Sequence, residues 1–165
     1  MAFYGTVEDG DAYFAARMFS WDWEQATEED KEKALQTATD LIDQFDYLGQ
    51  KYSITILGDD ASDEQRKAAN LDQPNEFPRG DVDLVPVEIE TAAYLIAQRL
   101  LSGRDPQMDL EGLSVKFERY GSVQSSYDRG GNTQEHLAHM IPSPQAWNLI
   151  KPFLRERNVF ITKRM

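Results

Sequence analysis

Apolar residues recur every three to four positions in four stretches of the chain, the spacing that places them on one face of an α-helix. The first stretch covers Asp9–Ser20, and the second and clearest follows Thr27, a residue suited to cap a helix. The third starts near Pro86 and closes at Gly103, and the last follows Ser143. This pattern predicts a mainly α fold, a small bundle of about four helices.

The residues of these apolar faces are the expected core. Pro152 removes a backbone donor from the last stretch, so we expect that helix to bend or shorten there. Trp21 and Trp23 follow the first stretch, and we expect both to clamp that helix to the core, because large aromatic side chains beside a helix end normally serve packing. In the first stretch the apolar contacts are expected from Tyr13, Ala16 and Phe19 or from Phe14 and Met18. The other expected core positions are Ala34, Leu35, Ala38, Leu41, Ile42, Phe45, Ile89, Ala92, Ala93, Ile96, Leu100, Ala146, Leu149, Ile150, Phe153 and Leu154.

The segment between the second and third helices has a different pattern. Tyr52–Leu57 is rich in β-branched residues and predicts a short extended run. Residues 58–83 predict a long acidic loop with one helical turn near Gln65–Asn70. A loop of this length in a compact domain is either mobile or committed to binding, and both interpretations stay open. The carboxylates that make it a candidate channel or partner loop are Asp59, Asp60, Asp63, Glu64, Asp72 and Glu76.

The last third of the chain predicts short strands and a tail. After a linker over Asp105–Gly112, the segments Leu113–Tyr120 and Ser122–Tyr127 meet at Gly121 and predict a β-hairpin over 113–127. Asn158–Met165 is an apolar, β-branched run with a basic end, suited to strand addition at a neighbour's surface. A terminal strand within the fold is the alternative. We therefore expect one helical domain over 1–157 and an extended tail over 158–165.

Charge divides the chain into two parts. The whole chain has 17 Lys and Arg against 29 Asp and Glu, a net charge of −12. Residues 1–111 hold 9 basic and 25 acidic side chains, a net of −16, whereas residues 112–165 hold 8 and 4, a net of +4. Such asymmetry suggests two differently employed surfaces, although a solvated acidic face that maintains solubility would produce the same imbalance.

The sequence offers little catalytic chemistry. It contains no cysteine, which excludes disulfides, thiolate nucleophiles and iron–sulfur clusters and fits a reducing cytoplasm. His136 and His139 could share a helical face, but no further zinc ligands stand at suitable spacing. The acidic loop lacks the ligand pattern of a calcium-binding loop, and a carboxylate-based hydrolase has no positive motif. We expect neither an enzyme nor a cofactor or metal site, and no apolar stretch is long enough to cross a membrane.

One cluster suggests nucleic-acid binding. Single-stranded DNA is bound by basic grooves that carry aromatic stacking platforms. The net charge of −12 opposes long-range attraction to phosphate, so this function remains the alternative. The residues of the cluster are Lys116, Arg119, Tyr120, Tyr127 and Arg129.

A series of short motifs, in a characteristic order, resembles the head-to-tail connector (neck adaptor) proteins of tailed bacteriophages, a family whose members are often labelled DnaT-like single-stranded-DNA-binding proteins. Each motif is weak alone, and the specificity lies in their order over nearly the whole chain. The long acidic insertion over 58–76 departs from the shorter loop of the family. The motifs are Asp11-Ala12-Tyr13-Phe14-Ala15-Ala16-Arg17, a tryptophan, Lys33-Ala34-Leu35-Gln36-Thr37-Ala38-Thr39, Gly49, Phe77-Pro78-Arg79, Val85-Pro86, Val115-Lys116-Phe117-Glu118-Arg119-Tyr120-Gly121-Ser122-Val123 and Leu149-Ile150-Lys151-Pro152-Phe153-Leu154.

The resemblance implies a structural virion protein without catalytic residues. It implies a homo-oligomeric ring, a dodecamer in this family, assembled in the bacterial host cytoplasm and placed at the virion neck between the portal protein and the tail or further neck proteins. DNA would pass through the lumen without specific binding, and acidic walls would not retard it. The expected segment for docking onto the portal or a neighbour is Asn158, Val159, Phe160, Ile161, Thr162, Lys163, Arg164 and Met165.

Overall fold

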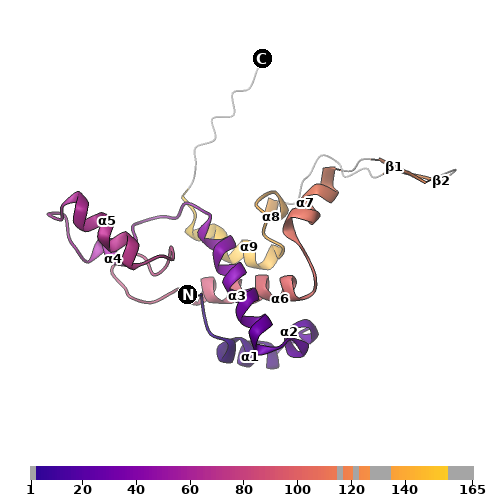
Figure 1. Cartoon of the computed structure of the whole chain (residues 1–165), viewed down its shortest axis with the longest axis horizontal. Helices are drawn as coiled ribbons and strands as arrows, with labels where there is room; N and C mark the ends of the chain where they lie inside the picture. Colours follow the sequence, from indigo (N-terminus) through magenta and orange to yellow (C-terminus); the bar gives the residue numbers. More distant parts are fainter. Residues whose placement is uncertain (1–2, 115–116, 121–122, 127–134, 156–165) are drawn as a thin grey trace, which may run out of the picture.

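Helices dominate the computed structural model, which describes residues 3–114, 117–120, 123–126 and 135–155 (Figure 1). The prediction of a mainly α fold is confirmed. The helices are α1 (Val7–Ala15), α2 (Trp21–Gln25), α3 (Glu28–Asp43), α4 (Tyr52–Thr55), α5 (Asp63–Asp72), α6 (Val87–Leu101), α7 (Pro106–Ser114), α8 (Glu135–Ala138) and α9 (Pro144–Ile150), and a 3₁₀ turn, η1 (Lys151–Phe153), follows α9.

Three helices build the core, with α6 packed between α3 and α9. Leu35 and Ile42 of α3, Ile89 and Ile96 of α6, and Ile150 of α9 are fully buried. Removing each such side chain from water stabilises the fold by roughly 2 kcal/mol. The predicted apolar stripes of these three helices therefore form one continuous core, with Leu41, Phe45, Leu100, Leu149, Phe153 and Leu154 partly buried at its edge.

Side-chain caps set the starts of α3 and α9 where the sequence predicts them. The Thr27 hydroxyl accepts a hydrogen bond from the backbone N–H of Asp30 at 3.2 Å, and the Ser143 hydroxyl accepts one from Ala146 at 3.3 Å. Pro144 occupies the first turn of α9, and the helix tightens into η1 around Pro152. The expected shortening at Pro152 is confirmed, because proline cannot donate the next helical hydrogen bond.

The first predicted helix is wrong in its extent, because the chain turns after Ala15 and starts a separate helix at Trp21. Phe19 has a φ of 65°, in the left-handed region that ends a right-handed helix. The turn also separates the two tryptophans: Trp23 is 1% exposed and packs on Phe14, whereas Trp21 is 68% exposed. The expectation of a clamp holds for Trp23 and is wrong for Trp21.

The predictions between α3 and α6 are also wrong in part. The expected extended run over Tyr52–Leu57 is largely the short helix α4. The expected loop over 58–83 contains the ten-residue α5, which includes the one helical turn predicted near Gln65–Asn70 and extends beyond it at both ends. Ser62 and Gln65 form a capping box, in which each side chain accepts a hydrogen bond from the other residue's backbone N–H. Local capping and packing between α4 and α5 form these helices despite their polar composition.

After α6 the chain forms a helix where the sequence predicts a linker and the start of a strand. From Pro106 onward the expected linker over Asp105–Gly112 belongs to α7, whose first turn is held by the Asp105 carboxylate accepting from the N–H of Gln107 at 2.9 Å. The helix continues through Ser114, so Leu113 starts no strand. Beyond it, strands β1 (Phe117–Tyr120) and β2 (Val123–Ser126) pair antiparallel, with Tyr120 opposite Val123.

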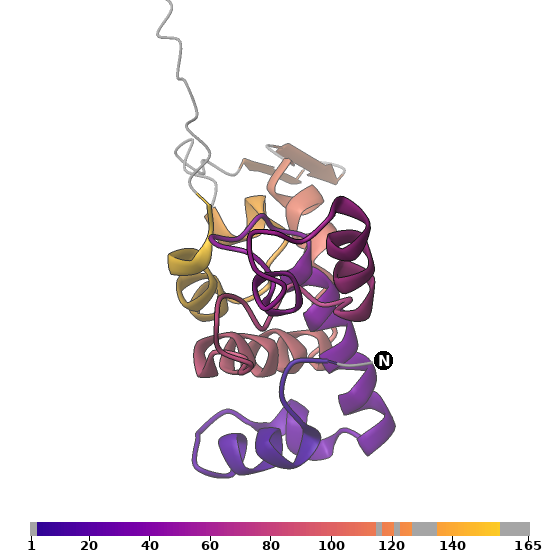
Figure 2. The same ribbon diagram turned by 90° about the vertical axis from the view of Figure 1, so that its left-hand side faces the viewer.

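The molecule extends two projections from its helical body. In Figure 1, α4 and α5 lie at one end of the longest axis and the β1–β2 pair lies at the other. Figure 2 shows the body from the side of α4 and α5, with α1 and α2 below α6 and with α8 and α9 above it. Within the described ranges, no helix has the length and apolar character required to span a membrane.

Candidate interaction surfaces

Residues 50–80 form an arm that leaves the helical body and returns to it (Figure 1). Its two ends are held together by backbone hydrogen bonds, from Gly80 to the carbonyl of Gln50 at 2.9 Å and from Tyr52 to the carbonyl of Pro78 at 3.0 Å. An isolated β-bridge joins Lys51 and Arg79. The arm is therefore a loop whose two ends are paired. We call these paired ends, residues 50–52 and 78–80, and the side chains that hold them the base of the arm.

Arg79 fastens the base of this arm to the end of α3. Its guanidinium donates to the backbone carbonyls of Leu48 at 2.9 Å and Gly49 at 2.6 Å, and to the Oε2 atom of Glu76 at 2.6 Å. A planar guanidinium can satisfy several acceptors at once, which suits it to this position. The predicted partner residue Glu76 thus serves within the base.

Lys51 completes the base from the other side. Its Nζ atom lies 3.3 Å from the Oε1 atom of Glu76 and donates to the carbonyls of Gln73 at 3.1 Å and Pro74 at 3.3 Å. Lys51 is buried, and a buried ammonium requires such partners to offset its lost hydration. The Glu76 carboxylate is thus shared by two cations at the base.

The other five predicted carboxylates of the segment are all exposed on the arm. Asp63 and Glu64 lie in the first turn of α5, where negative charge is favoured by the helix dipole. Arg66 donates to the carbonyls of Gly58 and Asp59, so it orders the turn before α5. We call the set Asp59, Asp60, Asp63, Glu64 and Asp72 the acidic arm surface.

A half-buried carboxyl group lies beneath the base. The Tyr4 hydroxyl donates a hydrogen bond to Asp43 of α3 and accepts one from the backbone N–H of Phe77 at 3.0 Å. Burial raises the pKa of Asp43 to about 6, and burial together with the Asp43 charge raises the pKa of Tyr4 far above its ordinary value. This pair joins the N-terminal segment, α3 and the arm.

An apolar corner stands on the turn between α1 and α2. Met18, Phe19 and Trp21 are 82%, 88% and 68% exposed. The Phe19 carbonyl accepts a hydrogen bond from the side chain of Gln98 on α6, which holds this turn on the body. Three large apolar side chains exposed together are unusual on a monomer and are typical of an interaction site. We call these three residues the apolar corner.

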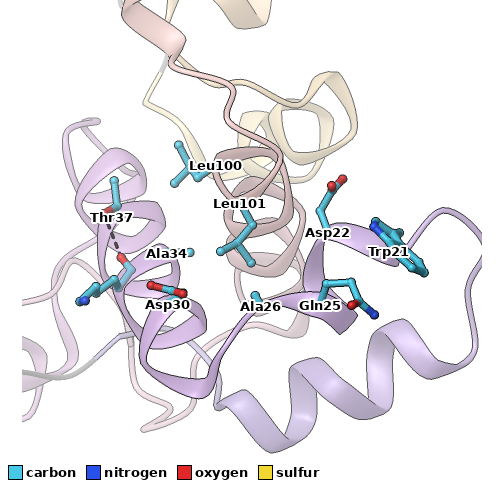
Figure 3. A pocket seen from close by; sticks show the side chains of 10 residues that line it. Trp21, Asp22, Gln25, Ala26, Asp30, Ala34, Thr37, Leu100 and Leu101 are labelled. Carbon is cyan, nitrogen blue, oxygen red and sulfur yellow. Dashed lines mark hydrogen bonds between the residues drawn. The ribbon is translucent and has the colours of Figure 1, made fainter.

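A groove of about 580 Å³ adjoins the apolar corner (Figure 3). It lies between α3 and the C-terminal end of α6, and α2 closes one end. Apolar side chains line it, Ala34 from α3 with Leu100 and Leu101 from α6. Carboxylates stand on its rim, Asp22 from α2 and Asp30 from α3. An apolar floor with acidic edges suits a segment that is apolar at its centre and basic beside it.

Another depression lies beside α8 and α9. His139 stacks on Trp147, with ring centroids 4.4 Å apart and ring planes 18° apart, and Phe45 packs against both. His136 is buried, and burial lowers its pKa. The two histidines are thus placed in packing contacts. Across the described ranges, no three His, Cys, Asp or Glu side chains gather closely enough to hold a metal ion.

Two predicted sites lie wholly or mainly outside the described residues. The whole tail over 158–165 lies outside the described residues. So do three residues of the basic and aromatic cluster, Lys116, Tyr127 and Arg129. The backbone of β1 carries the cluster's remaining members, Arg119 opposite Gln124 and Tyr120 opposite Val123. The cluster as a set, and the tail, remain predictions.

Sequence reasoning missed the apolar corner and the groove. The apolar run at Met18 and Phe19 resembles the continuation of a helix, so its exposure was not foreseen. The run Phe19-Ser20-Trp21-Asp22 did hold one signal, since serine followed by an acidic residue often marks a new helix start. The groove had no such signal, because it is formed by residues some seventy positions apart that only packing unites.

No protein-family model, no curated protein and no solved structure matches this chain significantly.

Proposed function

We propose that this chain is a structural virion protein, a head-to-tail connector adaptor that forms a ring between the portal and the tail of a tailed bacteriophage. The ordered motifs of the sequence support the family, and no catalytic role is part of the proposal. In this proposal the β1–β2 pair and the tail over 158–165 reach from the helical body toward partner chains.

The observation that carries the proposal is the apolar corner. Leaving Met18, Phe19 and Trp21 in water is unfavourable, because each could contribute roughly 2 kcal/mol if its surface were buried. A permanent neighbour that covers them would recover this free energy. Assembly into a fixed complex therefore explains the corner better than a freely soluble monomer does.

The acidic surface fits a passage for DNA. The first 111 residues carry a net charge of −16, and the acidic arm surface projects five carboxylates from a firmly held base. A channel wall of this sign repels phosphate and so does not retain the DNA that moves through it. The proposal assigns the arm to the lumen or to a basic partner beside it.

The test is the location of the protein in the virus particle. Electron microscopy of virions, or of this protein mixed with its portal, should show a ring at the neck. A protein absent from purified particles would overturn the proposal. Deleting Asn158–Met165 should leave a folded domain that no longer joins the portal or its neighbour, and retained assembly would show that the docking segment lies elsewhere.

Single-stranded-DNA binding, as a replication accessory protein, is the competing proposal. It rests on the basic and aromatic residues between Lys116 and Arg129, two of which, Arg119 and Tyr120, are adjacent on β1. A gel-shift titration with single-stranded DNA at low salt separates the two functions. Binding that weakens steeply with added salt would favour this alternative, and no binding at low salt would exclude it.

A further inference from the structure

The groove between α3 and α6 lacks a cover within the described part of the chain. Its floor combines the partly exposed Leu100 and Leu101 with the methyl groups of Ala26 and Ala34 (Figure 3). The exposed ring of Trp21 stands at one side. Small alanine side chains keep the floor low, so a few bulky apolar side chains of an extended segment can enter.

The rim of the groove selects for positive charge. Asp22 and Asp30 are both exposed there. Lys33 is the cation among the lining residues, and its Nζ atom is paired with Glu29 at 2.6 Å. The rim with Glu29 therefore holds three carboxylates and one ammonium. A nucleic acid is repelled by such a rim, whereas a basic peptide is attracted.

One segment of this chain has the matching composition. Residues 156–165 contain three consecutive apolar residues, Val159-Phe160-Ile161, flanked by Arg157 on one side and Lys163-Arg164 on the other. With Glu156, the segment has a net charge of +2. Its apolar centre and basic flanks correspond to the floor and the rim of the groove.

The place where this segment begins favours docking onto a second copy. Arg155 donates its backbone N–H to the carbonyl of Asp46 at 2.9 Å, just beyond the C-terminal end of α3. The groove lies beside Asp30, Lys33 and Thr37, which fall within the first ten residues of the same helix. A segment that leaves one end of α3 and a groove toward the other end can meet in a head-to-tail contact, which generates a ring when the rotation between copies closes.

We propose that residues 156–165 of one copy of this chain dock in the Trp21–Leu101 groove of the next copy. The contact places Phe160 and its apolar neighbours over Leu100 and Leu101 and brings the basic flanks to Asp22 and Asp30. It specifies which surfaces meet in the proposed ring and in that respect rests on the proposed function. The proposal assigns the tail to a neighbouring copy of this chain. The family resemblance alone left two docking partners open for the tail, the portal and a neighbour.

Disulfide trapping tests this contact in the purified full-length chain. Because the chain has no cysteine, Thr37→Cys at the rim and Thr162→Cys in the tail introduce the only thiols. The two single variants, carrying tags of different size, are mixed and oxidised, and the mixed dimer is measured on non-reducing gels. We expect at least tenfold more mixed dimer than from Thr162→Cys with Lys67→Cys, which places an exposed thiol on α5.

The contrary outcomes are distinct. Equal yields from the Thr37→Cys and Lys67→Cys mixtures would overturn the proposal. A double variant that forms only an internal disulfide, with no mixed dimer from the single variants, would assign the groove to the chain's own tail and would also overturn it. Failure of the proposed neck function would instead appear as absence of the protein from virions. The disulfide-trapped dimer is measured without the portal, so its formation does not depend on that function.

Charge exchange supplies an independent control. Asp22→Lys should lower the yield of mixed dimer severalfold, because it places a cation against the basic flanks. Adding Lys163→Glu and Arg164→Glu to the tail partner should restore most of the yield by reversing the pairing. If the yield of mixed dimer stays the same with either set of substitutions, the assigned orientation of the segment is contradicted.

Discussion

The Nη1 atom of Arg79 lies 2.6 Å from the Oε2 atom of Glu76, and this ion pair locks the base of the acidic arm. The same guanidinium reaches the carbonyls of Leu48 and Gly49 after α3. The arm is therefore attached by one cation that satisfies acceptors from two segments. A projection held in this way can present its charges in a fixed direction.

Arg79→Ala should destabilise the protein by about 2 to 3 kcal/mol, since hydrogen bonds to charged groups are lost and Glu76 keeps only Lys51 as its cation. Urea unfolding measures the loss, and limited proteolysis should cut first within residues 50–80. Arg99→Ala, on an exposed part of α6, is the matched control and should change stability by less than about 0.5 kcal/mol. Equal effects of the two substitutions would contradict the role of the base.

Asp43 should contribute a stability that decreases as pH rises. Its pKa in the folded protein is raised by burial from 3.8 to about 6, so the folded state favours the protonated form. The contribution is fully present below pH 3.8 and is lost as pH rises through about 6. Asp43→Asn removes this dependence. Urea unfolding at pH 4, 5, 6 and 7 should show the wild type losing stability relative to the variant, and parallel curves would refute the assignment.

Trp21 and Trp23 differ in burial and should therefore differ in their contributions to stability. Trp23 is buried and its indole N–H donates to Asp11 at 2.7 Å, so Trp23→Ala should cost about 3 to 5 kcal/mol. Trp21→Ala should change stability by less than about 0.5 kcal/mol and should instead weaken self-association. Urea unfolding and analytical ultracentrifugation separate the two effects. A large unfolding effect of Trp21→Ala would show that its ring serves the fold.

Phe19→Gly should raise stability while it weakens assembly. The φ of 65° costs a residue with a Cβ atom roughly 1 kcal/mol, and glycine avoids that cost. The phenyl ring is exposed, so its removal takes little from the core. Thermal unfolding should show the gain and ultracentrifugation the loss. A variant that is less stable would mean that the ring packs on the body.

Local patterns in the sequence account for much of the body. Periodic apolar residues and the caps Thr27 and Ser143 locate α3, α6 and α9, because these signals act within one helix. The helix α5 also had a local signal in the Ser62 and Gln65 capping box, which its polar composition obscured. For α4, β-branched residues favoured a strand, and contacts with α5 and with Pro78 overrode that preference.

The sequence by itself determined the acidic character of the chain, the apolar faces of α3, α6 and α9, and the capped starts of α3 and α9. Only the tertiary structure decided that Trp23 enters the core while Trp21 stays in water, and that Glu76 leaves the acidic set to join Lys51 and Arg79. It also formed the groove, from Ala34 and Leu101 among others. The physical reason is that burial and pairing depend on residues distant in the chain, whose positions no local pattern contains.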